Sequence, residues 1–425
     1  MKVEIPYGHD SISMNLERRE LIGVFSPLDF EDVPEAKAEL IRSIESPIGG
    51  RKLSRLINPG KKVAITVDDN TRPTPIRTIL PVLLGKIRSL GVKNEDVTIL
   101  VALGTHRPMT DREMREKYGP EVLEEYTVIN HEWDNPSELR PMGVLPGGVP
   151  IWINKTFMEA DVRIGVGNIV PHMTSGWAAG SKILLPGLAG EETVAGLHYF
   201  GAKTTPNAVG KDLNSPRTLM DNFAKEVGLH MIINTVLTRN GKIGRVYSGD
   251  FVGAHREGVK CSKRIYGIRI PQLADITIAS SHPADIEFWQ AEKGLFSADL
   301  STREGGGILL VTPCPEGISV THKKWTDLLA YNSKELEEMI ERKEVDDLTA
   351  ASLALCVAKI REPYTICLCS HGISDKEAEK LHFKKFDTPR EALEHLSKKL
   401  GGASKKLVLT HGGETYPIKP KCAET

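Results

Sequence analysis

The sequence predicts an α/β protein with two domains, each built on a mostly parallel sheet flanked by helices. Short runs rich in β-branched residues alternate with segments of helical periodicity, which is the pattern of parallel strands joined by helices. A chain of 425 residues is also too long for one ordinary core. We place the division at residues 1–270 and 271–425, and allow for a final segment that returns to the N-terminal domain. An active site is expected in the cleft between the two domains.

The N-terminal half contains three predicted strands, each a short apolar run. The first run, Lys62–Val67, is followed by apolar residues at helical spacing that end at Gly91. Thr110 is placed to cap a polar helix that continues to Lys117. The expected order is strand 62–67, helix 76–90, strand 96–103, helix 110–117 and strand 161–166.

The C-terminal half opens near Pro271 and continues the alternation of strands and helices. Gly305–Gly307 is predicted to be a loop rather than a linker. Cys367 and Cys369 alternate within one apolar run, so they should face the same side of a strand. The expected order is strand 275–279, helix 285–295, strand 307–312, strand 364–369, helix 388–400 and strand 406–409.

Composition and charge narrow the class of function. Lys and Arg number 55 against 56 Asp and Glu, so the net charge of -1 gives no broad electrostatic attraction to nucleic acid. The chain has no long uncharged apolar run, and its first residues lack a signal-peptide pattern, so we expect no membrane partner and a cytoplasmic location. The cysteines lack the paired spacing of a zinc site and are expected to be buried free thiols. They are Cys261, Cys314, Cys356, Cys367, Cys369 and Cys422.

Three polar clusters each follow a predicted strand. In open α/β sheets ligands bind beyond the carboxyl ends of the strands, so three clusters at three such ends could form one site. Each cluster also has an ordinary interpretation: Asp68 and Asp69 could cap the following helix, and His106 could be a plain loop histidine. The clusters are residues 68–73, 104–108 and 167–172.

The segment 167–198 combines His172, Lys182 and His198 with glycine and small apolar residues, a mixture that core folding does not require. Glycine lets the backbone approach a bound group closely. The Lys182 amine can be charged, or neutral and nucleophilic, and the histidines can transfer protons or bind a metal. The segment is not a phosphate-binding P-loop, because Ile183 stands where that motif needs Ser or Thr.

His106, His172 and His198 could supply imidazoles to a metal or to two faces of a substrate. A zinc metallohydrolase would place all three around the metal, but it would need an acidic ligand and would leave Lys182 without a role. An ordinary nicotinamide dehydrogenase would need a glycine fingerprint that the chain lacks.

Gln290 and Lys293 lie three residues apart in the predicted helix 285–295, so they share one of its faces. They could reach across the interdomain cleft to a carboxylate, with Lys293 as its counter-ion. The alternative is a solvated helix face with no ligand.

Taken together, these residues resemble the nickel-dependent lactate racemase family. The resemblance covers most of the chain, with the motifs in matching order and spacing. They are Asp-Asn-Thr-Arg-Pro at 69–73, Gly-Thr-His-Arg at 104–107, Pro-His at 171–172, Gly-Ser-Lys at 180–182, His198, and Gln-x-x-Lys at 290–293. The resemblance implies a racemase or epimerase that inverts the C2 centre of a 2-hydroxyacid, lactate-like or larger, by hydride transfer.

The resemblance also implies a cofactor, the nickel pincer nucleotide pyridinium-3-thioamide-5-thiocarboxylic acid mononucleotide with its nickel ion. It implies covalent attachment to Lys182, nickel ligation by His198 and an N-terminal cofactor-binding domain. Asp69, Gly180 and Ser181 would contact the cofactor. Proteins of cofactor synthesis and nickel insertion would be partners, and the substrate would be a small 2-hydroxyacid.

By the same resemblance, His106 and His172 form the acid/base pair of the reaction. The residues expected to contact the substrate are Arg72, Trp289, Gln290 and Lys293. The family has a tyrosine where this chain has Trp289, and a late tryptophan where this chain has none after Trp325, so the substrate is left open. A non-catalytic carrier of the same cofactor remains an alternative, although it would need neither the paired histidines nor Arg72.

Overall fold

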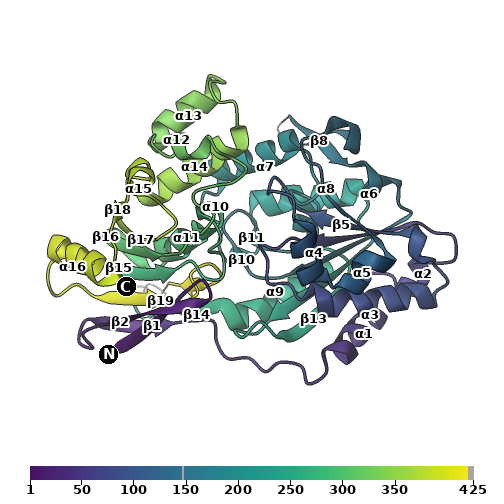
Figure 1. The fold of residues 1–425 in the computed structure, drawn as a ribbon, viewed down its shortest axis with the longest axis horizontal. Coiled ribbons are helices and arrows are strands. Elements are labelled where there is room, and N and C mark those ends of the chain that lie inside the picture. Colours follow the sequence, from purple (N-terminus) through teal and green to yellow (C-terminus); the bar gives the residue numbers. More distant parts are fainter. Residues whose placement is uncertain (146–147, 420–425) are drawn as a thin grey trace, which may run out of the picture.

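The computed structural model describes residues 1–145 and 148–419. Two α/β lobes lie side by side, with the N-terminal half of the chain in one and most of the C-terminal half in the other (Figure 1). Each lobe contains one six-stranded sheet, and helices pack against both sheets. The predicted fold class, two domains with mostly parallel sheets flanked by helices, is confirmed.

The first sheet is parallel apart from one edge strand. Its order is β13-β12-β9-β4-β5-β6, and β13 alone runs antiparallel to its neighbour. The first five residues of the central β4 are all buried, as expected of a strand covered on both faces. The bounds are β4 Val63–Asp68, β5 Val97–Ala102, β6 Thr127–Asn130, β9 Val162–Asn168, β12 Met231–Leu237 and β13 Ile243–Gly249. The three predicted strands of this half are confirmed.

The predicted helices of the first lobe are also present. α3 spans Ile76–Ser89 and buries an apolar stripe, and the chain reverses after it at Gly91, whose φ of 86° favours glycine. α4 spans Asp111–Tyr118 and begins at a capping box between Thr110 and Glu113. Further helices are α1 Ala36–Glu45, α5 Pro120–Glu125, α7 Glu191–Thr204, α8 Ser215–Val227 and α9 Gly253–Tyr266.

The second sheet is parallel throughout, with the order β18-β17-β16-β15-β19-β3. The predicted strands of the C-terminal half are all found in it. Its bounds are β3 Leu21–Phe25, β15 Ala274–Ser280, β16 Thr302–Val311, β17 Thr365–Cys369, β18 Lys384–Lys385 and β19 Lys406–Leu409. Packed helices of this lobe include α14 Leu348–Arg361 and α16 Pro389–Leu400, the latter at the predicted position.

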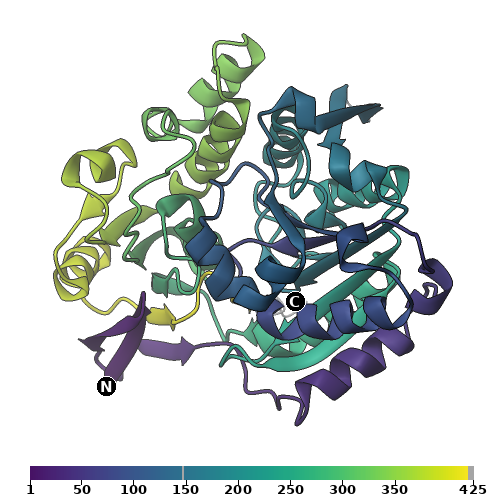
Figure 2. The ribbon, with the colours of Figure 1, turned by 45° about the vertical axis from the view of Figure 1, so that its right-hand side comes forward.

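The N-terminal residues belong to the second sheet, which the division at residue 270 did not anticipate. β3 pairs with β19, and the hairpin of β1 (Lys2–Tyr7) and β2 (Asp10–Asn15) packs on the same side (Figure 2). Apolar residues of this hairpin share a core cluster with β15, β16 and β17. At the other end, β20 (Tyr416–Ile418) pairs with β14 (Gly267–Arg269), so the chain returns toward the junction of the halves.

Two local predictions are wrong. Gly305–Gly307 lies inside β16 rather than in a loop, because the ladder to β15 shifts register here and glycine permits both the close backbone contact and the φ of 73° at Gly305. The helix expected at 285–295 is two short helices, α10 (Phe288–Ala291) and α11 (Lys293–Asp299), which meet at Glu292.

Cys261, Cys314, Cys356, Cys367 and Cys369 are buried free thiols, as predicted, and Cys422 lies outside the described residues. Cys367 and Cys369 share one core cluster, which confirms that they face the same side. None of the helices in the described ranges has the length and apolar character to cross a membrane.

Candidate active site

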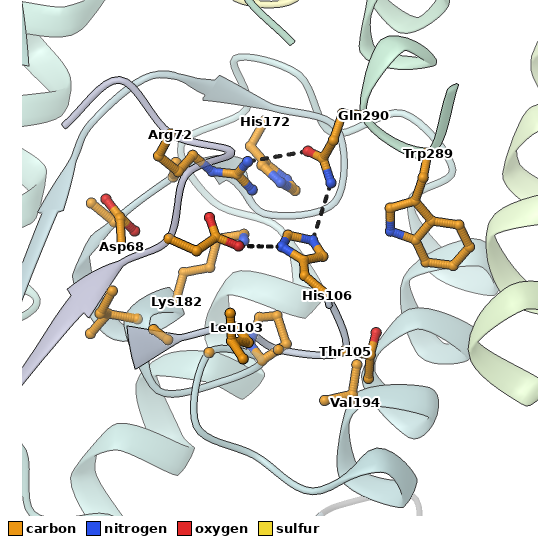
Figure 3. A pocket seen from close by; sticks show the side chains of 18 of the residues that line it. Asp68, Arg72, Leu103, Thr105, His106, His172, Lys182, Val194, Trp289 and Gln290 are labelled. Carbon is orange, nitrogen blue, oxygen red and sulfur yellow. Dashed lines mark hydrogen bonds and ion pairs between the residues drawn. The ribbon is translucent and has the colours of Figure 1, made fainter. Parts of the chain in front are cut away.

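The polar clusters that follow β4, β5 and β9 meet in one pocket between the lobes. The carboxyl ends of these neighbouring parallel strands share an edge of the first sheet, so their following loops converge. Trp289 and Gln290 on α10, together with Lys293 on α11, close the pocket from the second lobe (Figure 3). Its polar lining comprises Asp68, Asp69, Arg72, Thr105, His106, Asn168, His172, Lys182, His198, Trp289, Gln290 and Lys293.

His106 is held by a carboxylate. Its Nδ1 lies 2.6 Å from Asp69 Oδ2, and the hydroxyl of Thr71 donates to the other oxygen of that carboxylate at 2.6 Å. Burial alone would raise the pKa of Asp69, but His106, Arg72 and these hydrogen bonds hold it well below its usual range. An ionised Asp69 keeps the proton of a neutral His106 on Nδ1, which leaves Nε2 as the acceptor of the Gln290 amide at 3.1 Å.

Gln290 lies between Arg72 and Lys293. Its Oε1 accepts hydrogen bonds from Arg72 at 3.2 Å and from the Lys293 amine. Burial and the charge of Arg72 lower the pKa of Lys293 well below its usual value. An oxygen that accepts from these two donors occupies the kind of position that a carboxylate oxygen would take, and a carboxylate there would favour the charged form of Lys293. Although the predicted helix is broken at Glu292, Gln290 and Lys293 still lie on the pocket side, as expected.

His172 has a different environment. It lies on the short strand β10 (Pro171–His172), which forms a hairpin with β11 (Gly176–Trp177), and it is 7% exposed. Its Nδ1 accepts a hydrogen bond from the backbone N–H of Thr174 at 3.2 Å. Burial, followed by the charges of Lys182 and Arg72, lowers the pKa of His172 well below its usual value, so the ring is neutral at pH 7.

Lys182 lies in the short 3-10 helix η3 (Gly180–Ile183) and contributes to the pocket wall. Burial and the charge of Arg72 lower the pKa of Lys182 to about 7. A large share of this amine is therefore uncharged near neutral pH, which is the state needed for a nucleophile or for an amide-type bond.

His198 lies on α7 and lines the same pocket. Its Nδ1 is buried without a hydrogen-bond partner, and burial together with the charge of Lys182 lowers the pKa of His198 to about 3. A buried neutral imidazole without a protein partner is a suitable metal ligand, because it need not lose a proton or a hydrogen bond to bind.

The structure does not place Gly180 and Ser181 in the pocket lining. The Ser181 hydroxyl donates to Asp221 at 2.5 Å and accepts from Arg217 at 3.1 Å. A Cβ at Gly180, where φ is 63°, would come within 2.8 Å of the His255 ring. In this arrangement both residues shape the loop that carries Lys182.

Three residues around the pocket were missed by sequence reasoning. Arg217, only 4% exposed, donates to the carbonyls of Ala179 at 3.2 Å and of Trp177. Trp133 donates to the carbonyl of His106 at 3.3 Å, and His322 stacks on Trp289 with ring centroids 4.3 Å apart. Each acts through a contact distant in sequence, and no local motif marks it.

The histidines do not form a three-ligand metal site. Across residues 1–145 and 148–419, no three His, Cys, Asp or Glu side chains are grouped as metal ligands. His106 is bonded to Asp69 and Gln290, while His172 accepts from a backbone amide. This geometry does not support the metallohydrolase alternative.

The structure consists of two α/β lobes with a pocket of buried titratable groups between them, and comparison with known proteins gives the class of the protein. Models of the lactate racemase N-terminal domain and the lactate racemase C-terminal domain match residues 7–210 and 271–414. The chain belongs to the lactate racemase family and is an isomerase of the racemase class.

Similar proteins cover most of the chain. Lactate racemase from Thermoanaerobacterium thermosaccharolyticum is 32% identical over 321 residues, 74% of this chain and 75% of the relative. Lactate racemase from Lactiplantibacillus plantarum is 28% identical over 96% of this chain and 98% of its own length. The solved apoprotein of the T. thermosaccharolyticum lactate racemase superposes with a TM-score of 0.88 at 26% identity, covering 99% of this chain and 100% of that one. A Thermotoga maritima structure at 20% identity, with a TM-score of 0.73 over 92% of this chain and 100% of its own, shares the fold.

Proposed function

We propose that this protein racemises or epimerises a 2-hydroxyacid, lactate-like or larger, by inverting its C2 centre. The observation that carries this proposal is that two imidazoles and two hydrogen-bond donors suited to a carboxylate share one pocket. His106 and His172 are the imidazoles, while Arg72 and Lys293 both donate to the side-chain oxygen of Gln290. A family of racemases and two named lactate racemase relatives support the reaction class.

The proposed role of Arg72 and Lys293 is to bind the substrate carboxylate in place of the Gln290 oxygen. The bound carboxylate would favour the charged form of Lys293, so charge-assisted hydrogen bonds from both side chains would fix it and leave C2 between the histidines. Removing the C2 hydrogen as a proton would build a carbanion beside that carboxylate, which is unfavourable. Removing it as hydride, while a base takes the hydroxyl proton, gives a planar 2-oxoacid.

His106 and His172 would serve as bases on opposite sides, because the hydroxyl points to a different side in each enantiomer. The proton of His106 lies on Nδ1, which donates to Asp69. Nε2 is therefore unprotonated and can take a proton directly. His172 is neutral, but its Nδ1 accepts from the Thr174 amide, which places its own proton on Nε2. To act as a base, His172 must release that amide or exchange its proton.

The residues present fit the implied nickel pincer nucleotide, pyridinium-3-thioamide-5-thiocarboxylic acid mononucleotide. Lys182 would hold it covalently through its weakly basic amine, and His198 would ligate the nickel through its unpartnered imidazole. When bound, the group supplies a hydride acceptor and donor. Asp69 hydrogen-bonds His106 in this structure, and a contact between Asp69 and the cofactor would be made in addition to that bond. Partners for cofactor synthesis and nickel insertion, and a location in the cytoplasm where they act, belong to this proposal.

Trp289 lies on the pocket wall without a hydroxyl to offer the substrate, and it packs against His322, which stacks on it, and Trp325, which contacts it edge-on. The wall on this side favours apolar contact over a hydrogen bond. Substrate choice is therefore tested with a panel rather than with lactate alone.

The test is the intact denatured mass of the protein coexpressed with the enzymes that make the pincer cofactor, alongside Lys182→Ala. A cofactor-sized adduct on the wild type and none on the variant is the expected result. The loaded protein is then given single enantiomers of lactate, malate, phenyllactate and sugar acids, and the opposite enantiomer or epimer is measured. No adduct on either protein, with a known racemase loaded in parallel, would reject the cofactor. An adduct without turnover of any panel member would favour the carrier alternative.

A further inference from the structure

A second histidine–carboxylate pair lies at the contact between the lobes. His322 is 4% exposed, and its Nδ1 lies 2.6 Å from Asp347 Oδ2 in the same lobe. Its Nε2 lies 2.9 Å from the hydroxyl oxygen of Thr105 in the other lobe. Asp347 is itself fixed as the N-cap of α14, where it accepts from the Ala350 amide at 2.8 Å. The His322 ring thus connects the two lobes through both of its nitrogens.

This connection parallels the one made by His106. His106, in the first lobe, bonds a carboxylate through Nδ1 and reaches Gln290 in the second lobe through Nε2. His322, in the second lobe, bonds a carboxylate through Nδ1 and reaches Thr105 in the first. Thr105 directly precedes His106, and Trp289 directly precedes Gln290. Each imidazole therefore bonds a carboxylate in its own lobe and a side chain in the other lobe.

Aromatic stacking adds a second contact to the same segments. The rings of His322 and Trp289 are 4.3 Å apart at 10°, a close parallel stack. Trp325 contacts Trp289 edge-on at 4.7 Å, and Trp133 stacks more distantly on His322 at 6.4 Å. Trp289 and Thr105 both line the pocket, so His322 contacts two residues of the pocket wall from the side that faces away from the pocket.

His322 has no polar atom left for a substrate. Burial raises the pKa of Asp347, but the hydrogen bond from His322 outweighs it, so the pKa of Asp347 is lowered and its carboxylate is ionised. A neutral His322 then donates from Nδ1 and accepts the Thr105 hydroxyl at Nε2. His322 is also absent from the residues that line the pocket, so its influence passes through Thr105 and Trp289.

We propose that His322 is a positioning residue which, through Thr105 and Trp289, holds His106 and the pocket wall in the closed arrangement of the lobes. The proposal rests on the proposed function for its catalytic consequence, but the interlobe contact itself can be tested without any substrate. The hydroxyl of Thr105 is the critical atom, because it is the only part of His106's loop that His322 bonds among the described residues.

The experiment compares Thr105→Val, which keeps the shape of the side chain, with Thr105→Ser, which keeps the hydroxyl. His322→Phe keeps the stack on Trp289 and loses the hydrogen bonds. Lys324→Ala is the matched control. Lys324 forms an exposed ion pair with Asp346, close in sequence to His322 and Asp347, and neither residue of the ion pair lines the pocket. The double variant Thr105→Val/His322→Phe tests whether the two residues act as one unit.

Two measurements are made on each variant. Amide hydrogen exchange of residues 103–107 in the cofactor-free protein should speed up at least fivefold in Thr105→Val and His322→Phe, and stay unchanged in Thr105→Ser and Lys324→Ala. In loaded protein, kcat for d- and l-lactate, or for the 2-hydroxyacid that the panel selects, should fall about tenfold in the first two variants, because both lose the buried hydrogen bond between His322 and Thr105. KM should stay within twofold, because Arg72 and Lys293 are untouched.

The double variant should be no worse than either single one. Additive losses, equal losses in Thr105→Ser and Thr105→Val, or unchanged exchange in His322→Phe would each overturn the proposal. If His322→Phe does not fold, the comparison of Thr105→Val with Thr105→Ser decides the proposal by the same exchange measurement. A wild type that turns over no panel member would reject the proposed function, while the exchange measurement would still decide the role of His322.

Discussion

His106 and His172 are the same side chain held in two contrasting ways. His106 is bonded to the ionised carboxylate of Asp69 and is partly open to solvent, with 20% of its side chain exposed. His172 is buried, has no carboxylate partner, and takes its only described hydrogen bond from a backbone amide. A carboxylate fixes the tautomer of the first ring, whereas the hairpin backbone fixes the second.

The difference teaches that a pair of bases need not be symmetric to serve a symmetric reaction. Asp69 makes His106 ready to accept a proton at Nε2 and stabilises the imidazolium that results. The nearby charges of Lys182 and Arg72 disfavour an imidazolium at His172. We expect the proton transfers at the two histidines to differ in rate, and the predictions below test the two environments.

The largest expected effect is the loss of either base. His106→Ala and His172→Ala should each lower interconversion in both directions by about 10³-fold or more, since a positioned acid or base contributes roughly 10² to 10⁴. Both variants should still carry the cofactor adduct, because Lys182 is untouched. Rates are measured with each enantiomer separately, and the adduct by intact mass. Unchanged rates would remove the acid/base role, and a lost adduct would show that the histidine supports cofactor attachment instead.

Asp69→Asn should have the next largest effect. The amide would donate to Nδ1 rather than accept from it, so the His106 proton would move to Nε2 and block its use as a base. We expect kcat/KM to fall about 10²-fold for both enantiomers, because His106 is the base in one direction and the acid in the other. Thr71→Val, which removes only one hydrogen bond to that carboxylate, is the control and should fall less than tenfold. A loss in Asp69→Asn no larger than that in Thr71→Val would show that Asp69 does not set the tautomer of His106.

The elements that position these histidines could be predicted because buried strands have a strong sequence pattern. Asp69, Arg72, His106 and His172 all follow such strands, so the parallel sheet alone brings them to one edge. By contrast, β3 is a five-residue edge strand that joins the second sheet through a partner 385 residues away, and no local pattern shows that pairing.

The supports of the site were not predictable for the same reason. His322 and Thr105 are 217 residues apart, and Arg217 reaches carbonyl oxygens, which every residue type possesses. The Gly-Ser-Lys motif shows a related limit, since its lysine lines the pocket and its serine hydroxyl bonds Asp221 instead. Sequence indicates which chemical groups are present, while the direction of each side chain is set by packing.

Arg217 is a buried cation that supports the hairpin carrying His172, but unlike Asp69 at His106 its hydrogen bonds go to backbone carbonyls and not to the histidine. Its guanidinium donates to the carbonyls of Ser175 and Ala179, at 3.4 and 3.2 Å, on either side of β11. Arg217→Met should destabilise the protein by about 3 kcal/mol, because several buried acceptors lose their donor. Arg217→Lys should recover part of this through one ammonium. Urea unfolding of the cofactor-free proteins measures both, and a neutral Arg217→Met would show that the loop holds itself.

The smallest expected effect concerns the pH dependence of stability, in which His172 should differ from Asp69, the partner of His106. His172 has a folded-state pKa well below the unfolded value of about 6.5, so the unfolded chain binds the extra proton first. Its stabilising neutral form is fully available above pH 6.5, and stability is lost as pH falls below that value, by up to about 1.4 kcal/mol per pH unit for one proton. His172→Gln removes this titrating group, so the urea midpoint of the variant should fall less than that of the wild type between pH 7 and 5.5.

The pKa of Asp69 is also lowered in the folded protein, but Asp69 titrates at a lower pH than a histidine. Its contribution to stability is present above the unfolded value of 3.8 and is lost only as the pH falls further. Asp69→Asn should therefore leave the pH 7 to 5.5 interval nearly unchanged, and equal slopes in His172→Gln and the wild type would show that His172 is solvated rather than buried when folded.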